Sequence, residues 1–186
     1  STTLFIPVIK GGLNYLKQLE SNLGVSFLRE LKSSEFKYSF MEKASFQILG
    51  KNKAININFI GLGEANKLDE EMVFKAFSSI TYSRIKSKKT IKDLSVIFPV
   101  SIDKKLISLC IQGLYNGFYT FDKYKSKKDN SSQLKVGINL ELITTNQLAC
   151  INKEAQNIFS AVNLTRELIN EPPQTLTPAA LASHAK

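Results

Sequence analysis

The alternation of short β-type runs with longer helical patterns is the feature of this sequence that most constrains its fold. β-branched and apolar residues cluster in four runs, at 3–9, 54–60, 94–99 and 134–142. Apolar residues at helical spacing lie between these runs. Parallel strands need crossovers of a dozen or more residues, and the crossover helices cover the sheet. The sequence therefore predicts an α/β fold, with a mixed or mainly parallel sheet flanked by helices on both faces.

The first 49 residues add smaller elements to this frame. Leucines at helical spacing predict a short helix around 13–19, and a second around 27–31. From 35 to 49 aromatic and polar residues alternate loosely, which favours strands across this stretch. We therefore expect two short helices and further strand structure before the run at 54–60.

Three longer helices are expected further along the chain. The first starts near the acidic residues 69–71, which suit the positive end of a helix dipole. The second starts at Asp103 and carries Gly113 and Gly117, a spacing that allows close packing against another element. The third runs from about Asn146 to Asn170, where the following prolines stop it. Residues 121–132, polar and rich in lysine, are expected to form an exposed loop.

Gly61-Leu62-Gly63 stands where a phosphate-binding turn would lie, between a strand and a helix. A dinucleotide site needs a third glycine, where this chain has Asn66, and an acidic residue about 20 positions on. The residues around Thr81 are basic or neutral instead. We interpret the glycines as a structural strand-to-helix turn.

The sequence contains few residues of the types that commonly carry out catalysis in an arrangement that would form a site. The only histidine, His184, has no cysteine or carboxylate at metal-ligand spacing. Cys110 and Cys150 lie in apolar patterns and are interpreted as small buried hydrophobic residues. The acidic residues 69–71 point around a helix rather than into one site. We therefore assign no catalytic, metal-binding or cofactor-binding residue in this chain.

The net charge of +9 permits attraction to nucleic acid. Only three cations are arginines, however, and base-specific recognition depends heavily on arginine. Aromatic residues interleave with lysines at 118–125, as in single-strand binders, although packing at a helix end explains them more simply. We expect at most weak, sequence-independent binding. No apolar run reaches the roughly 20 residues that span a membrane.

Three stretches together resemble the cytosolic leucyl aminopeptidases. The most specific is NLTRELINEPPQTLTP at 163–178, which is similar to the family segment that joins the N-terminal and catalytic domains. FIGLG at 59–63 and the region from GLY at 113–115 to FDKYK at 121–125 agree in order and spacing. The resemblance covers roughly residues 54–186.

The resemblance implies a macro-domain-like α/β domain over 1–170, followed by a linker and the first residues of a catalytic domain at 171–186. It also implies removal of N-terminal residues from peptides by a cytoplasmic homohexamer, with two divalent metals, zinc or manganese. The metal ligands and catalytic residues would lie in a catalytic domain outside this chain, leaving assembly and access to this one. Two alternatives stay open: a nucleic-acid-binding module and a free-standing macro-like domain that binds ADP-ribose.

Overall fold

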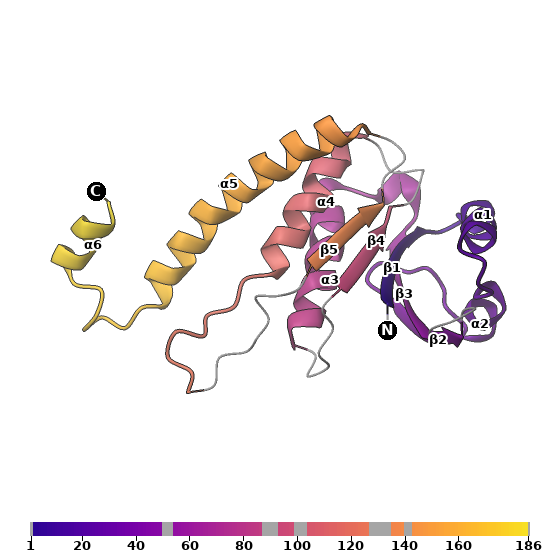
Figure 1. Ribbon diagram of the computed structural model, residues 1–186, viewed down its shortest axis with the longest axis horizontal. Coiled ribbons are helices and arrows are strands. Elements are labelled where there is room, and N and C mark those ends of the chain that lie inside the picture. Colours follow the sequence, from indigo (N-terminus) through magenta and orange to yellow (C-terminus); the bar gives the residue numbers. More distant parts are fainter. Residues whose placement is uncertain are drawn as a thin grey trace.

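A mixed β-sheet forms the centre of the molecule (Figure 1). The computed structural model describes residues 2–49, 54–86, 93–98, 104–126, 135–139 and 143–185. Within them the strand order is β2-β3-β1-β4-β5. The strands are β1 (Thr2–Ile9), β2 (Lys43–Leu49), β3 (Ala54–Gly63), β4 (Asp93–Ile97) and β5 (Lys135–Asn139). All neighbours are parallel except β2, which is antiparallel to β3, so the predicted mixed α/β sheet is confirmed.

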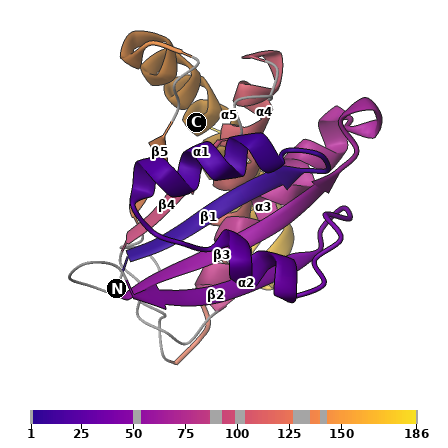
Figure 2. The ribbon, with the colours of Figure 1, turned by 90° about the vertical axis from the view of Figure 1, so that its right-hand side faces the viewer.

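Helices cover both faces of this sheet, as predicted. The helices are α1 (Leu13–Leu23), α2 (Leu28–Ser33), α3 (Glu70–Lys86), α4 (Lys104–Gly117), α5 (Thr145–Asn170) and α6 (Pro178–His184), with a 3-10 turn η1 (Ala65–Lys67). Figure 2 shows α1 and α2 in front of the sheet and α3 and α4 behind it. Helix α5 packs on α4, and Figure 1 shows α6 at the far end of α5. The result is a layered α/β domain with one long helix leading out of it.

The alternation along β1 divides the core into two halves. Leu4, Ile6 and Val8 join the apolar cluster beneath α1 and α2. Phe5 and Ile9 join the cluster beneath α3 and α4. Successive strand residues point to opposite faces, so a strand that is apolar at nearly every position is buried on both sides. This explains why β1 lies in the middle of the sheet.

The strand structure expected across 35–49 is only partly present. Residues 43–49 form β2, whereas residues 35–42 form a loop. Glu35, Tyr38 and Met41 have φ values of 57°, 62° and 64°. Non-glycine residues with positive φ leave the extended conformation, so the alternation of residue types could not continue as a strand. The prediction is therefore wrong for 35–42.

Helices α3 and α4 contact each other closely at the two glycines that the sequence indicated. A Cβ atom on Gly113 would lie 2.6 Å from the carbonyl oxygen of Phe74. A Cβ atom on Gly117 would lie 2.0 Å from Thr81 Oγ1 and 2.2 Å from the carbonyl oxygen of Ser78. Neither position has room for a side chain, so the close-packing prediction is confirmed.

The long helix α5 has sharp ends that its sequence explains. Thr144 and Gln147 form a capping box, in which the Gln147 N–H donates to Thr144 Oγ1 at 3.3 Å. The helix ends at Asn170, and Pro172 and Pro173 follow, as predicted. Of the predicted strand at 134–142, residues 135–139 form β5, and the others lie outside the described residues.

Candidate functional site

The Gly61-Leu62-Gly63 segment lies inside β3 and is not the strand-to-helix turn that the sequence predicted. The Gly61 N–H donates to the carbonyl oxygen of Glu42 at 2.8 Å, and the Met41 N–H donates to the carbonyl oxygen of Gly61 at 2.9 Å. A Cβ atom on Gly61 would lie 2.0 Å from the carbonyl oxygen of Ser39. The glycine therefore allows the 35–42 loop to lie against the strand, and the strand continues because this loop pairs with it.

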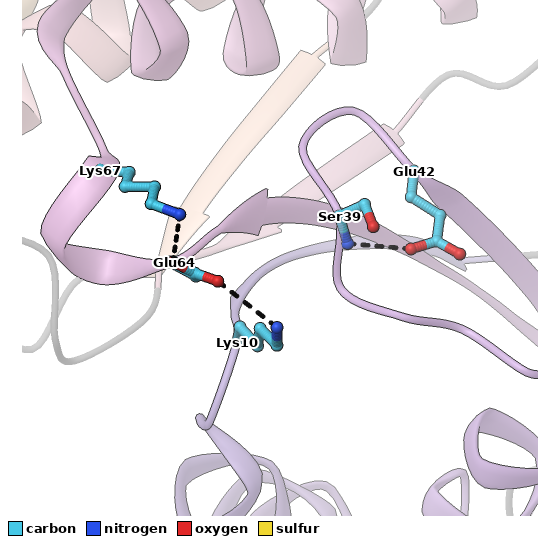
Figure 3. Close-up of polar contacts among 5 residues, drawn as sticks. All are labelled: Lys10, Ser39, Glu42, Glu64 and Lys67. Atoms are coloured by element: carbon cyan, nitrogen blue, oxygen red, sulfur yellow. Dashed lines mark hydrogen bonds and ion pairs between the residues drawn. The ribbon is translucent and has the colours of Figure 1, made fainter.

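Ion pairs occupy the edge where β1 and β3 end, the side at which open α/β sheets commonly bind ligands. Glu64 contacts the ammonium groups of Lys67 at 2.8 Å and Lys10 at 3.5 Å (Figure 3). Lys67 and, after it, Lys10 lower the pKa of the Glu64 carboxyl. Nearby, the Ser39 N–H donates to Glu42 at 2.9 Å. Both lysines already have a carboxylate partner, which disfavours a phosphate site between them.

A second polar cluster joins the C-terminal half of α5 and the residue after it to the end of α4 and the segment that follows α4. We call it the α5 junction. Its members are Asn116, Tyr119, Lys123, Tyr124, Arg166, Asn170 and Glu171. Its hydrogen bonds connect residues that are 47 to 51 positions apart in the sequence. The junction therefore ties two distant segments of the chain to each other.

Arg166 organises the half of the junction nearest to α4. Its guanidinium donates to Asn116 Oδ1 at 2.5 Å and lies over the Tyr119 ring, 5.2 Å from its centroid. Asn116 Nδ2 in turn donates to Ser78 Oγ on α3 at 2.7 Å. Asn170 Nδ2 donates to the Tyr119 hydroxyl at 3.0 Å. Side chains from α3, α4 and α5 thus form one connected polar network.

Glu171 organises the other half of the junction, directly after α5 ends. Lys123 Nζ lies 2.5 Å from one carboxylate oxygen, and the Tyr124 hydroxyl donates to the other. The Lys123 ammonium, followed by the Tyr124 hydroxyl, lowers the pKa of Glu171. The same contact raises the pKa of Lys123. The carboxylate is thereby held in its charged form.

The junction brings together two segments that the sequence analysis treated separately. Residues 113–125 and 163–178 carried two parts of the family resemblance, and the contacts above join them. The aromatic residues at 118–125 were interpreted as packing at the end of a helix. Phe121 does pack on Tyr124 there, and Tyr119 and Tyr124 in addition make polar contacts with Asn170 and Glu171. A signal for this pairing was present in the complementary Lys and Glu residues, but spacing alone does not identify partners.

The remaining candidate residues lie apart from one another. His184 is exposed at the end of α6. Cys110 is buried in the core, which raises the pKa of its thiol, whereas Cys150 is exposed on α5. The prediction of burial is therefore wrong for Cys150, because the neighbouring α5 residues that pack on the core are Leu148, Ile151 and Ala155.

No group of three or more His, Cys, Asp or Glu side chains in the described part of the chain could hold a metal ion. The residues present there do not fit a two-metal site. Among the helices of the same ranges, none is long and apolar enough to cross a membrane.

Comparison with known proteins places these features in a family context. Residues 10–128 match the model described as "Cytosol aminopeptidase family, N-terminal domain". A probable cytosol aminopeptidase of Treponema denticola is 28% identical over 95% of this chain, which spans 37% of that relative's length. A tomato leucine aminopeptidase variant has a TM-score of 0.75 at 21% identity. This match covers 99% of this chain and 38% of the tomato chain. The bottromycin maturation enzyme BotP, solved in complex with Mn, has a TM-score of 0.68 at 16% identity. This match covers 98% of this chain and 34% of the BotP chain.

Proposed function

The chain belongs to the cytosol aminopeptidase family, as an N-terminal domain of that family, and on this premise we propose that the whole protein is a metal-dependent aminopeptidase. Its substrates would be peptides, from which it would remove N-terminal residues, often leucine. The match of residues 10–128 to the family's N-terminal domain is the observation that carries this proposal. The relatives that match nearly the whole of this chain are named aminopeptidases and are more than twice its length.

In this proposal the domain over 1–170 is macro-domain-like and non-catalytic, and residues 171–186 lead toward the catalytic domain. The domain would serve assembly into a homohexamer and access of peptides in the cytoplasm. The α5 junction supports the division at 170, because its contacts end at Glu171, directly after the helix. Self-association of the purified protein, measured by light scattering, tests the assembly role, and a monomer at micromolar concentration would contradict it.

The two divalent ions of the proposed enzyme, zinc or manganese, would be held by residues outside this chain. The described residues offer no fitting ligand group. We therefore derive no catalytic step within them. BotP, whose fold is similar to that of this chain, was solved in complex with Mn.

The decisive experiment compares two proteins. Sequencing the encoding transcript beyond both ends of the 186 residues defines the complete product. That product should hydrolyse a leucyl amide substrate, and a chelator should abolish the activity. The 186-residue chain alone should show no turnover with added Zn²⁺ or Mn²⁺. A mock purification from the same host controls for contaminating peptidases.

Metal-dependent turnover by the short chain would place catalytic groups within it and contradict the domain assignment. A complete product that is inactive on peptides would contradict the aminopeptidase proposal itself. Tight, sequence-specific binding of a DNA duplex at physiological salt would favour the nucleic-acid-binding alternative instead, because lysine-based counterion release alone weakens steeply with salt.

A further inference from the structure

The chain beyond Glu171 leaves the body of the domain at the end of α5. The hydrogen bonds described for residues 172–185 all stay within that segment, as turns after Pro172 and as the caps and backbone of α6. Figure 1 shows α6 set apart from the sheet and from the helices that cover it. Among the described residues, the hydrogen bonds that tie this segment to the body are therefore those of the residues that connect α6 to α5.

Glu171 is the connecting residue whose side chain is tied to the body. Its side chain is only 7% exposed, between Lys123 Nζ and the Tyr124 hydroxyl. Its backbone N–H donates to the carbonyl oxygen of Leu168 at 3.3 Å, which closes the last turn of α5. The backbone then becomes extended, with ψ at 138°, and Pro172 follows. One residue thus both ends the helix and fixes the start of the segment that leaves it.

We propose that Glu171, Lys123 and Tyr124 form a latch, a reversible conformational device that fixes the direction in which the chain leaves α5. With the latch closed, the α6 segment has one orientation relative to the body. With the latch open, the segment samples several orientations, because its other hydrogen bonds are internal. The proposal concerns the orientation of a segment and does not depend on peptide hydrolysis.

The chemistry of the contacts makes this latch reversible. Lys123 and Tyr124 remain 54% and 55% exposed, so water can replace each of them as a partner of Glu171. The ion pair joins the exposed Lys123 ammonium to a carboxylate that is 7% exposed, so water and salt reach the pair from the lysine side. The segment that carries Lys123 and Tyr124 is better anchored, because it begins directly after Gly117, where α4 packs closely on α3.

The test measures the distance between α6 and the body by double electron–electron resonance. One spin label is placed on the exposed native Cys150, and the second on a Ser183→Cys substitution in α6. Cys110 is buried in the core, so the label should not reach it under native conditions. The labelled chain at neutral pH and low salt should give one narrow distance distribution. Glu171→Gln, Lys123→Met and Tyr124→Phe should each broaden it, and Glu171→Gln should broaden it most.

Two controls separate a latch from general loss of structure. Lys75→Met removes the exposed Glu71–Lys75 ion pair of α3, at 2.5 Å, and should leave the distribution narrow. The exchanged pair Lys123→Glu with Glu171→Lys should restore the narrow distribution. Unfolding midpoints identify any variant that fails to fold. Unchanged distributions in all three single variants, or no recovery in the folded exchanged pair, would overturn the proposal.

Discussion

The α3–α4 contact and the α5 junction both hold helices together, but close apolar packing dominates the first and polar contacts dominate the second. The α3–α4 contact depends on missing side chains, at Gly113 and Gly117, and on buried apolar residues around them. The α5 junction depends on polar side chains, several of which remain exposed. The first contact leaves no space for a side chain at these two glycines, whereas the second can exchange its partners for water.

This difference predicts different sensitivities for the two regions. Apolar packing contains no group that titrates, and salt does not screen it. Charged hydrogen bonds respond to pH, to salt and to the loss of single atoms. Substitutions in the body of the domain should therefore change global stability, and substitutions in the junction should change mainly the orientation of the segment beyond it.

The largest effect is expected for Phe77→Ala. Phe77 is fully buried on α3, and its ring centroid lies 4.9 Å from that of Phe98. Truncation of a buried phenylalanine costs about 3–5 kcal/mol of unfolding free energy. Denaturant titration measures this loss. Leu164→Ala, at a position 48% exposed on α5, is the control and should stay within about 0.5 kcal/mol of the parent.

A comparable effect for the two variants would show that the body and α5 do not differ in packing, and would remove the basis of the comparison.

The next largest effect is expected for Gly117→Ala. The added methyl group would lie 2.0 Å from Thr81 Oγ1, so α3 and α4 must separate or shift. Such overpacking costs about 1–3 kcal/mol, although alanine is the better helix former by about 1 kcal/mol. Gly137→Ala on β5 is the matched control, because its nearest neighbour outside the adjacent residues is Ser95 Oγ at 3.4 Å. Thermal unfolding of both variants measures the difference.

If Gly117→Ala stabilised the protein, helix propensity would outweigh the close contact, and the α3–α4 contact would be more adaptable than proposed.

The same contrast explains which features the sequence could predict. The apolar run of β1 and the helical spacing of apolar residues in α5 depend on neighbouring residues, so local patterns were sufficient to predict both elements. Gly61 was misinterpreted because its partner is the 35–42 loop, which is distant in sequence and bent by positive φ at Tyr38. The partners in a polar network cannot be derived from the spacing of residues along the sequence, because a lysine can form an ion pair with any carboxylate that the fold brings near it. The α5 junction was therefore visible in the sequence only as two separate motifs.

Asn116→Ala tests the boundary between the two regions and should have an intermediate effect. Asn116 accepts from Arg166 at 2.5 Å and donates to Ser78 Oγ at 2.7 Å, so it connects α5 to α3. Loss of a hydrogen bond costs about 0.5–1.5 kcal/mol of unfolding free energy, and the bond to Arg166 is only partly buried. Gln112→Ala is the control, since its amide bonds only to Ser108 on its own helix, at 3.1 Å. Urea titration measures the free energy of unfolding of both variants. Equal losses of this free energy would contradict the role of Asn116 in connecting α5 to α3.

The smallest expected effect on global stability, and the sharpest on orientation, comes from lowering the pH. The Lys123 ammonium and then the Tyr124 hydroxyl lower the pKa of Glu171, and the charge of His184 on α6 acts in the same direction. A carboxyl whose pKa falls on folding contributes stability above its unfolded pKa and loses it as the pH falls through the folded value. Glu167 faces Lys123 and also favours its charged form, so Lys123 stays charged in this range.

The latch should therefore stay closed at neutral pH and open only in acid, below the ordinary pKa range of a glutamate, while the apolar contacts of α3 and α4 persist. The distribution of distances between labels on Cys150 and position 183, followed from neutral to acid pH, should change from narrow to broad before pepsin, which is active in acid, cleaves within the core. Glu171→Gln removes the titrating group and should make the distribution broad at every pH. A transition that persists in Glu171→Gln would assign the acid response to another carboxyl and separate it from the latch.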